Sequence, residues 1–185
     1  MSVWIRSHND GEIICNERLP VFTYNHPHFE SLNKKLMKEM GDSGIEFLFP
    51  EQIHNLDGSS TNVKALQTYN SIETPSLSLI KQWAMDLVRG YGGFNYNVPQ
   101  CWVALYNKGD YTKSHGHFPA SFAFVYFVKS PKGSSPLVFS TSGKRVTPNE
   151  GKLVLFHGSL RHKVPKNRCN GRIVVAGNLY LNDAF

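Results

Sequence analysis

Residues 172–181 read Arg-Ile-Val-Val-Ala-Gly-Asn-Leu-Tyr-Leu, and this stretch decides the class of fold. Its β-branched and aromatic residues are typical of a β-strand. Similar short runs precede it from residue 101 onward, and clusters of Gly, Pro, Ser and Asn separate them. The runs that we expect to form strands are residues 101–106, 122–128, 137–140, 153–156 and 173–181. Many short strands at close spacing predict a sandwich or jelly roll rather than a parallel sheet.

The first half of the chain carries helical patterns instead. Apolar residues recur at helical spacing between Pro27, which can occupy the first helical position, and Gly41, which can end the helix. A second helix is predicted to begin at Pro75, after the capping residue Thr74, and to end at Gly90. Each helix has one apolar stripe, so we expect both to pack on the outer face of one sheet. The predicted fold class is therefore α+β with a β-rich core.

The composition favours one domain over residues 1–185. Hydrophobic residues make up 41% of the chain and aromatic residues 12%, which is enough to build a core and excludes a disordered chain. The 18% of charged residues is too low for a solvated coiled coil. No apolar run approaches the roughly 18 residues of a membrane-spanning helix. We expect residues 1–98 to form a variable, helical support region and residues 99–185 to form the β-rich core.

Cysteine usage and the start of the chain both favour a cytoplasmic location. Cys15, Cys101 and Cys169 form no C-x-x-C pair, so neither a disulfide framework nor a thiolate zinc site is predicted. The first residues lack the apolar stretch of a secretory signal. The net charge of +6 permits nucleic acid as a partner but favours it only weakly, because the charge is spread along the chain.

Among the eight histidines, His115 and His117 form the pair best placed to bind one ion. In extended backbone, residues two apart point to the same face about 6.6 Å from each other, so two imidazoles can chelate a metal. His162 follows 45 residues after His117, just beyond the predicted strand 153–156. That separation allows a β-sandwich to bring a later strand beside an earlier one. The three histidines are therefore candidate metal ligands.

Three other histidines fit a ligand role less well. His26 and His28 share the two-residue spacing, but they open a predicted helix, where such positions do not share a face. We interpret them as capping and surface residues. His157 also follows the predicted strand 153–156, and it is the second choice for a ligand.

Arg172 indicates what the metal would hold. It lies ten residues after His162, at the start of an apolar strand where a lone inward guanidinium would be out of place on structural grounds alone. Arginine binds a carboxylate with two parallel hydrogen bonds. A metal site with a buried arginine one strand away describes an enzyme that binds a small carboxylate beside its metal.

These residues resemble the iron(II)- and 2-oxoglutarate-dependent oxygenases, in particular the prolyl-hydroxylase-like branch with its bacterial and tailed-phage members. The resemblance spans residues 99–182. The segments that carry it are residues 102–111 leading into His115-Gly-His117, residues 123–131, residues 151–156, and the ordered set His162, Arg172 and Asn178.

The resemblance implies a double-stranded β-helix, which is a cupin-like jelly roll, with iron and 2-oxoglutarate held between its two sheets. It implies that His115 and His162 bind Fe(II) and that Arg172 pairs with the distal carboxylate of 2-oxoglutarate. The implied reaction is hydroxylation of a small molecule, protein or peptide, coupled to decarboxylation of 2-oxoglutarate to succinate. A phage-encoded member would act in the host cytoplasm.

The second metal ligand departs from the family's common pattern. That pattern is His-x-Asp or His-x-Glu, which gives two histidines and one carboxylate. Here His117 occupies the carboxylate position, as in the bacterial and phage subgroup, and we expect it to bind as a third histidine. The alternative is that His117 does not bind and that Asp110, the nearest carboxylate in sequence, completes the site.

The hydroxyl groups that assist the arginine also depart from the family. If Ala123, Val125 and Phe127 face the metal, the tyrosine expected at the end of that strand is replaced by Phe127. Tyr106 and Tyr126 are the candidate phenols for the cofactor site, and Tyr106 is the better placed of the two. Asn178 fits the family pattern on the last strand and is a further candidate for cofactor binding.

Two alternatives to this function stay open. A cupin-like dioxygenase with three histidines would bind its substrate directly on the metal and would not use 2-oxoglutarate. A non-catalytic jelly roll would be a binding module or a phage structural module. Nucleic acid is an improbable partner for the basic cluster at residues 161–172, because no aromatic residue is interleaved there to stack on bases. Its outer residues fit a rim that steers an anionic ligand.

Overall fold

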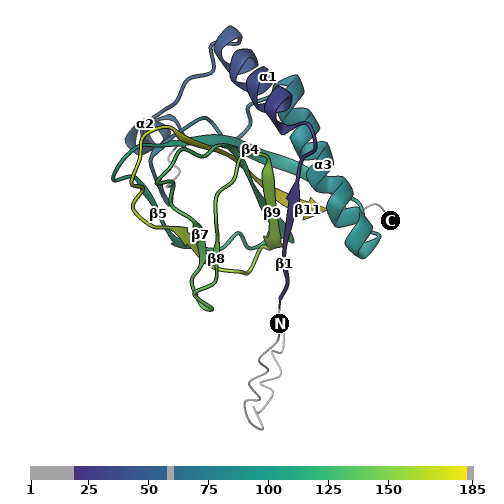
Figure 1. Ribbon diagram of the computed structural model, residues 1–185. Helices are drawn as coiled ribbons and strands as arrows, with labels where there is room; N and C mark the ends of the chain where they lie inside the picture. Colours follow the sequence, from purple (N-terminus) through teal and green to yellow (C-terminus); the bar gives the residue numbers. More distant parts are fainter. Residues whose placement is uncertain (1–18, 58–60, 183–185) are drawn as a thin grey trace, which may run out of the picture.

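The computed structural model describes residues 19–57 and 61–182, and two antiparallel sheets form its centre (Figure 1). The major sheet has six strands in the order β1-β9-β6-β11-β4-β3, and the minor sheet has five in the order β2-β5-β10-β7-β8. The major-sheet strands are β1 (Val21–Asn25), β3 (Leu66–Gln67), β4 (Tyr96–Tyr106), β6 (Phe122–Lys129), β9 (Lys152–His157) and β11 (Arg172–Leu181). The minor-sheet strands are β2 (Val63–Lys64), β5 (Tyr111–His115), β7 (Leu137–Phe139), β8 (Arg145–Val146) and β10 (His162–Val164).

The five predicted strands correspond to β4, β6, β7, β9 and β11, so the β-rich second half is confirmed. The other strands were not predicted from the sequence. All six are two to five residues long, and β5 has the largely polar sequence Tyr-Thr-Lys-Ser-His. Such short segments become strands because they pair with longer neighbours, and local propensity does not reveal this.

Three helices complete the described part of the chain: α1 (Phe29–Asp42), α2 (Pro50–Asp57) and α3 (Pro75–Gly92). Helices α1 and α3 lie side by side over one face of the major sheet, as the sequence predicted (Figure 1). Leu36 of α1 and Ile80 of α3 are fully buried there against Phe124 and Val175 of the sheet. None of these helices combines the length and apolar character needed to cross a bilayer.

The ends of α3 follow from its sequence. The side chain of Thr74 accepts a hydrogen bond from the Leu77 N–H at 3.2 Å, and Pro75 occupies the first turn, as expected. The helix continues two residues beyond the predicted Gly90, because it is Gly93 that adopts the left-handed conformation, with φ of 73°. Helix α1 begins two residues after Pro27, and α2 was not predicted at all.

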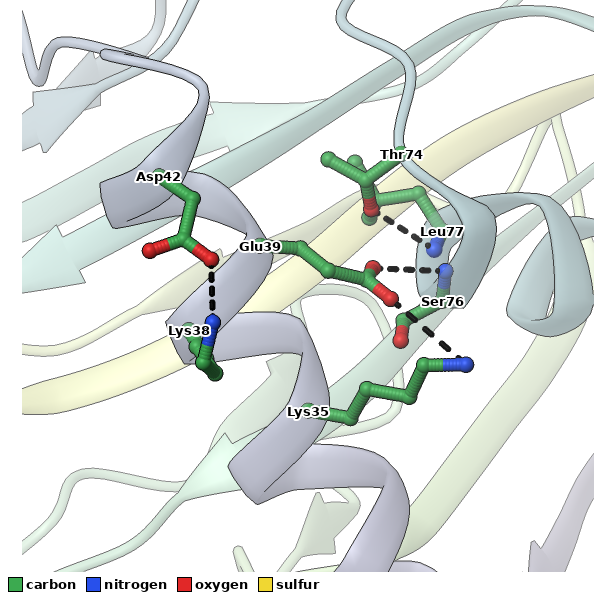
Figure 2. Close-up of polar contacts among 7 residues, drawn as sticks. All are labelled: Lys35, Lys38, Glu39, Asp42, Thr74, Ser76 and Leu77. Atoms are coloured by element: carbon green, nitrogen blue, oxygen red, sulfur yellow. Dashed lines mark hydrogen bonds and ion pairs between the residues drawn. The ribbon is translucent and has the colours of Figure 1, made fainter.

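Glu39 of α1 fixes the two long helices to each other (Figure 2). Its Oε2 accepts a hydrogen bond from the backbone N–H of Ser76 at 2.8 Å, in the first turn of α3. A carboxylate at this position also interacts favourably with the positive end of the helix dipole. Lys35 lies 3.7 Å from the other carboxylate oxygen, while Lys38 pairs with Asp42 on the exposed side of the same helix.

One hydrophobic core lies beneath α1 and α3, and a second lies between the two sheets, where it positions the candidate site. Side chains alternate along β6, so that Val125 and Phe127 point into this layer and Phe124 and Tyr126 point toward the helices. The alternation predicted for this strand is therefore confirmed. Arg172 also lies in this layer, beside Phe127, and the candidate histidines His117 and His162 lie near its residue Phe156.

Candidate functional site

Three histidines meet at one end of the layer between the sheets. His115 ends β5, His117 follows two residues later, and His162 begins β10, where it lies opposite His115 in the register of the minor sheet. One nitrogen from each ring lies within 4.8 Å of the others, a grouping that could hold a metal ion. Nε2 of His117 and Nε2 of His162 are 3.3 Å apart. Two nitrogens bound to one ion at about 2.1 Å would lie about 3.0–3.4 Å apart, so this separation fits shared coordination.

The opposite ring nitrogens of two histidines are already bound to the backbone. Nδ1 of His115 lies 2.8 Å from the carbonyl oxygen of Lys113, and Nδ1 of His162 lies 3.0 Å from that of Leu160. A carbonyl accepts only, so each Nδ1 carries the proton and donates it. This leaves Nε2 of both rings with a free lone pair directed at the cluster, as is usual for metal-binding histidines.

Burial keeps the three imidazoles neutral. It lowers the pKa of His117 to about 3 and that of His162 to about 4, and neighbouring imidazoles lower both further because two positive charges would repel. Burial also lowers the pKa of His115. Neutral imidazole is the form that binds metals, so the site is ready to accept a cation at pH 7 without losing protons.

Two glycines allow the segments that carry these histidines to approach each other. The N–H of His117 donates to the carbonyl of Gly158 at 2.7 Å, and a Cβ on Gly116 would lie only 3.3 Å from that same oxygen. A Cβ on Gly158 would lie 2.0 Å from the carbonyl oxygen of Ala120, which no side chain tolerates. The sequence shows both glycines, but only the fold shows what they approach.

Arg172 lies in the same layer, at the start of β11. Its side chain has no exposed surface, and its guanidinium carbon lies 4.5 Å above the ring of Tyr106 and 5.5 Å from that of Phe127. Its three nitrogens find no hydrogen-bond partner within the described part of the chain. Burial lowers the pKa of this group, but arginine stays protonated at any physiological pH. A buried cation without a partner is costly, so the guanidinium fits a bound carboxylate.

Tyr106, a candidate phenol for the cofactor site, lies beside this arginine. It is opposite Arg172 in the β11–β4 register and is almost completely buried. Its hydroxyl shares a hydrogen bond of 2.6 Å with the hydroxyl of Thr112 on the minor sheet. Thr112 was not predicted from the sequence, since nothing in its local pattern distinguishes it from other strand threonines.

The prediction for Tyr126 is wrong. Its side chain points away from the layer between the sheets and packs among the residues beneath α1 and α3. Its hydroxyl donates to Oδ1 of Asn33 in α1 at 2.7 Å. Residues one apart on a strand face opposite sides, and Phe127 takes the side that faces Arg172.

The side chain of Asn178 lies far from Arg172. Six residues of strand separate the two, which is about 20 Å in extended backbone, so they cannot bind the same carboxylate. Nδ2 of Asn178 donates to Oε1 of Gln100 on β4 at 2.8 Å. Together with Trp102, His115 and His117, these two residues line a cleft of about 340 Å³ that opens in front of the histidine cluster.

His157 and Asp110, the two alternative ligands, lie outside the histidine cluster. Nδ1 of His157 lies 2.7 Å from the hydroxyl of Ser159, and its ring packs beside Phe122. Asp110 accepts a hydrogen bond from the N–H of Asn107 within its own turn. Among residues 19–57 and 61–182, the grouping that could hold an ion therefore contains no carboxylate. His26 lies beside Trp83 on the helix side, outside the cluster, as expected.

Comparison with solved structures agrees with this architecture, whereas no family model and no curated protein matches the chain. A viral collagen prolyl hydroxylase from Paramecium bursaria Chlorella virus 1, solved with 2-oxoglutarate, is 16% identical, with a TM-score of 0.64 over 86% of this chain and 94% of its own. A Pseudomonas putida prolyl-4-hydroxylase is 17% identical, with a TM-score of 0.63 over 88% and 92%. HygX from Streptomyces hygroscopicus, solved with nickel, 2-oxoglutarate and hygromycin B, is 10% identical, with a TM-score of 0.65 over 86% and 82%.

These likenesses establish the fold. Two antiparallel sheets, helices on the outer face of one of them, and similarity over most of each chain confirm the predicted double-stranded β-helix.

Proposed function

We propose that this chain, which has the fold of the iron(II)- and 2-oxoglutarate-dependent oxygenases, is itself such an enzyme and hydroxylates its substrate. The observation that carries the proposal is the pairing of two features within one buried layer. Three neutral imidazoles converge at one end, and an arginine without a partner lies in the same layer. Either feature alone is compatible with a purely structural role, but together they fit a metal and a dicarboxylate.

His115, His117 and His162 would hold the iron. Imidazole nitrogen is a suitable donor for Fe(II), although a carboxylate usually replaces one of the three. Three neutral donors leave the full double charge on the ion. The negative charge that this chain lacks would then come from the carboxylate of the bound 2-oxoglutarate, so we expect the metal and the cosubstrate to bind cooperatively.

Arg172 would hold the other end of 2-oxoglutarate. A guanidinium offers two parallel N–H donors to a carboxylate, and burial strengthens such a bond because water does not compete. The ring of Tyr106 holds the guanidinium in place through a cation–π contact, and the Tyr106 hydroxyl shares a hydrogen bond with that of Thr112. The apolar side chains of Phe127 and Val174 exclude water from this end.

Bound iron and 2-oxoglutarate would supply the oxidising chemistry: one O₂ is consumed, 2-oxoglutarate becomes succinate and CO₂, and one oxygen atom enters the substrate as a hydroxyl. The residues of the chain orient the reactants. The two Nδ1 bonds hold the rings of His115 and His162, and Phe156 packs against His162 with ring centroids 4.7 Å apart. The substrate would approach through the cleft that His115 and His117 line.

An anaerobic titration tests this function. Protein with one equivalent of Fe(II) is expected to develop a visible charge-transfer absorption when 2-oxoglutarate is added, and Arg172→Met is expected to weaken this response. Addition of oxygen should then release succinate. Oxygen consumption without succinate would favour the three-histidine dioxygenase instead. Failure to retain any divalent metal would contradict both enzymes and favour a non-catalytic module.

A further inference from the structure

We propose that the substrate enters the cleft in front of the histidines through an uncharged, hydroxyl-rich group, and that this group is a sugar ring. The inference rests on the proposed function, which places the reacting carbon beside the metal. It goes further, because the side chains that line the cleft limit which chemical groups can bind there. The cleft is lined by residues of α2, β2, β3, β4, β5 and β11 and of the segments next to them.

The described lining carries no formally charged side chain. Among the residues that line it within 19–57 and 61–182 there is no Asp, Glu, Lys or Arg. A charged group that enters loses hydration, and it needs an opposite charge to compensate. Apart from the metal, whose charge the bound 2-oxoglutarate would offset, the described lining offers none. The chain as a whole carries 34 charged residues, 20 Lys and Arg against 14 Asp and Glu. The group that enters is therefore neutral.

The polar groups of the lining are carboxamides and hydroxyls arranged to bind both donors and acceptors. Oε1 of Gln100 accepts from Nδ2 of Asn178 at 2.8 Å and from the hydroxyl of Tyr180 at 3.2 Å. This directs Nε2 of Gln100 away from both residues as a donor, while the oxygen of Tyr180 keeps its ability to accept. Each hydroxyl of a sugar is both donor and acceptor, so neighbouring ring hydroxyls can satisfy such a pair.

Aromatic side chains supply the apolar surface that a ring also needs. Trp102 lies two residues after Gln100 on β4 and therefore faces the same side of the strand. Phe118 follows His117 directly, lines the cleft and is 89% exposed. A flat aromatic face covers the C–H face of a sugar ring, while the amides bind its edge.

Nucleotides match this lining less well. A nucleotide brings a phosphate, and the described lining has no Lys or Arg to receive it. The cleft volume of about 340 Å³ falls within the range of small-molecule sites.

Ligand-observed NMR on protein loaded with Zn(II) and 2-oxoglutarate tests the inference without turnover. The probes are N-acetylglucosamine and maltose as uncharged sugars, glucosamine and glucose 6-phosphate as charged ones, and an uncharged proline-containing tripeptide amide. We expect the uncharged sugars to bind at least tenfold more tightly than the other three. Tighter binding of the peptide or of a charged sugar, or no binding of any uncharged sugar, overturns the proposal.

Variants show whether binding occurs in the cleft. Gln100→Ala is expected to weaken sugar binding about three- to tenfold, as the loss of one hydrogen bond does. Gln82→Ala, on the exposed side of α3, is the matched control and should have no effect. An equal effect of both variants overturns the proposal. Calorimetric titration of 2-oxoglutarate on the same sample separates the two hypotheses: loss of sugar binding with 2-oxoglutarate binding intact overturns only this one, whereas absent 2-oxoglutarate binding overturns the proposed function.

Discussion

Arg172 lies directly opposite Tyr106 in the β11–β4 register, with its guanidinium 4.5 Å above the phenol ring and its nitrogens without a partner in the described chain. A cation–π contact with an aromatic ring holds the guanidinium in position but does not occupy its N–H donors. The arginine is therefore fixed in orientation and still available to an anion. This combination is what a permanent carboxylate-binding position requires.

Replacement of this arginine should separate ligand binding from stability. Arg172→Met removes a buried, unpaired cation and keeps most of the volume, so we expect the metal-free protein to be unchanged or more stable by about 1 kcal/mol. The affinity for 2-oxoglutarate should fall at least about 30-fold, because a charge-assisted pair of bonds is lost. Thermal unfolding with and without 2-oxoglutarate measures both effects. Arg168→Met, at an exposed position, is the control and should bind normally.

Metal binding should depend on His162 and not on His157, although only five positions separate them. His162→Ala removes one of three converging nitrogens and should abolish stoichiometric retention of a divalent metal after dialysis. His157→Ala removes a ring that contacts Ser159 and Phe122, so metal retention should be unchanged. Elemental analysis measures the metal that each dialysed variant retains. An equal loss of metal from both variants would contradict the assignment of His162 as a ligand.

The close approach at Gly158 predicts opposite effects of the same substitution at two glycines. Gly158→Ala places a Cβ 2.0 Å from the Ala120 carbonyl, so it should destabilise the fold by several kcal/mol, on the order of 3, and weaken metal binding through displacement of His117. Gly90→Ala, in α3 and with no atom near its Cβ, should stabilise by up to about 1 kcal/mol. Denaturant titration checks both values. A neutral effect at Gly158 would contradict the described packing.

Glu39 predicts a pH-dependent link between α1 and α3. Burial alone would raise the pKa of this carboxyl, but hydrogen bonding to Ser76 and the nearby Lys35 leave it lowered. The ionised form of Glu39 is therefore favoured in the folded state and adds to folding stability. This contribution is complete above the unfolded pKa of about 4.5, and it is lost as the pH falls through the lower folded pKa. Glu39→Gln should lower Tm by about 2–4 °C at pH 7, as loss of a helix cap does, with a smaller difference at pH 3. Asp42→Asn on the exposed side of α1 should change Tm by less, since its ion pair is exposed.

Tyr126 should matter for stability alone. Tyr126→Phe leaves Oδ1 of the buried Asn33 without its donor, which should cost about 1–3 kcal/mol of stability. The affinity for 2-oxoglutarate should be unchanged, because the ring faces the helices. Denaturant titration and calorimetric binding measure the two quantities. Reduced binding without loss of stability would contradict the described orientation.

The sequence by itself determined the elements whose causes are local. Thr74 and Pro75 begin a helix through capping and a fixed φ, and the long apolar runs form the central strands. The spacing of His115 and His117 places both rings on one side of an extended segment. These features follow from a few neighbouring residues, so they could be predicted without knowledge of the rest of the chain.

The tertiary structure decided which long-range partners meet. Alternation on β6 separates Tyr126 from Phe127, but only the packing of α1 and α3 on one face assigns Tyr126 to the helices and Phe127 to Arg172. Pairing of β10 with β5 selects His162 over His157, because that register brings His162 opposite His115. Short strands such as β2 and β3 gain their stability from neighbours distant in sequence, so the cleft that they help to line could not be predicted from local patterns.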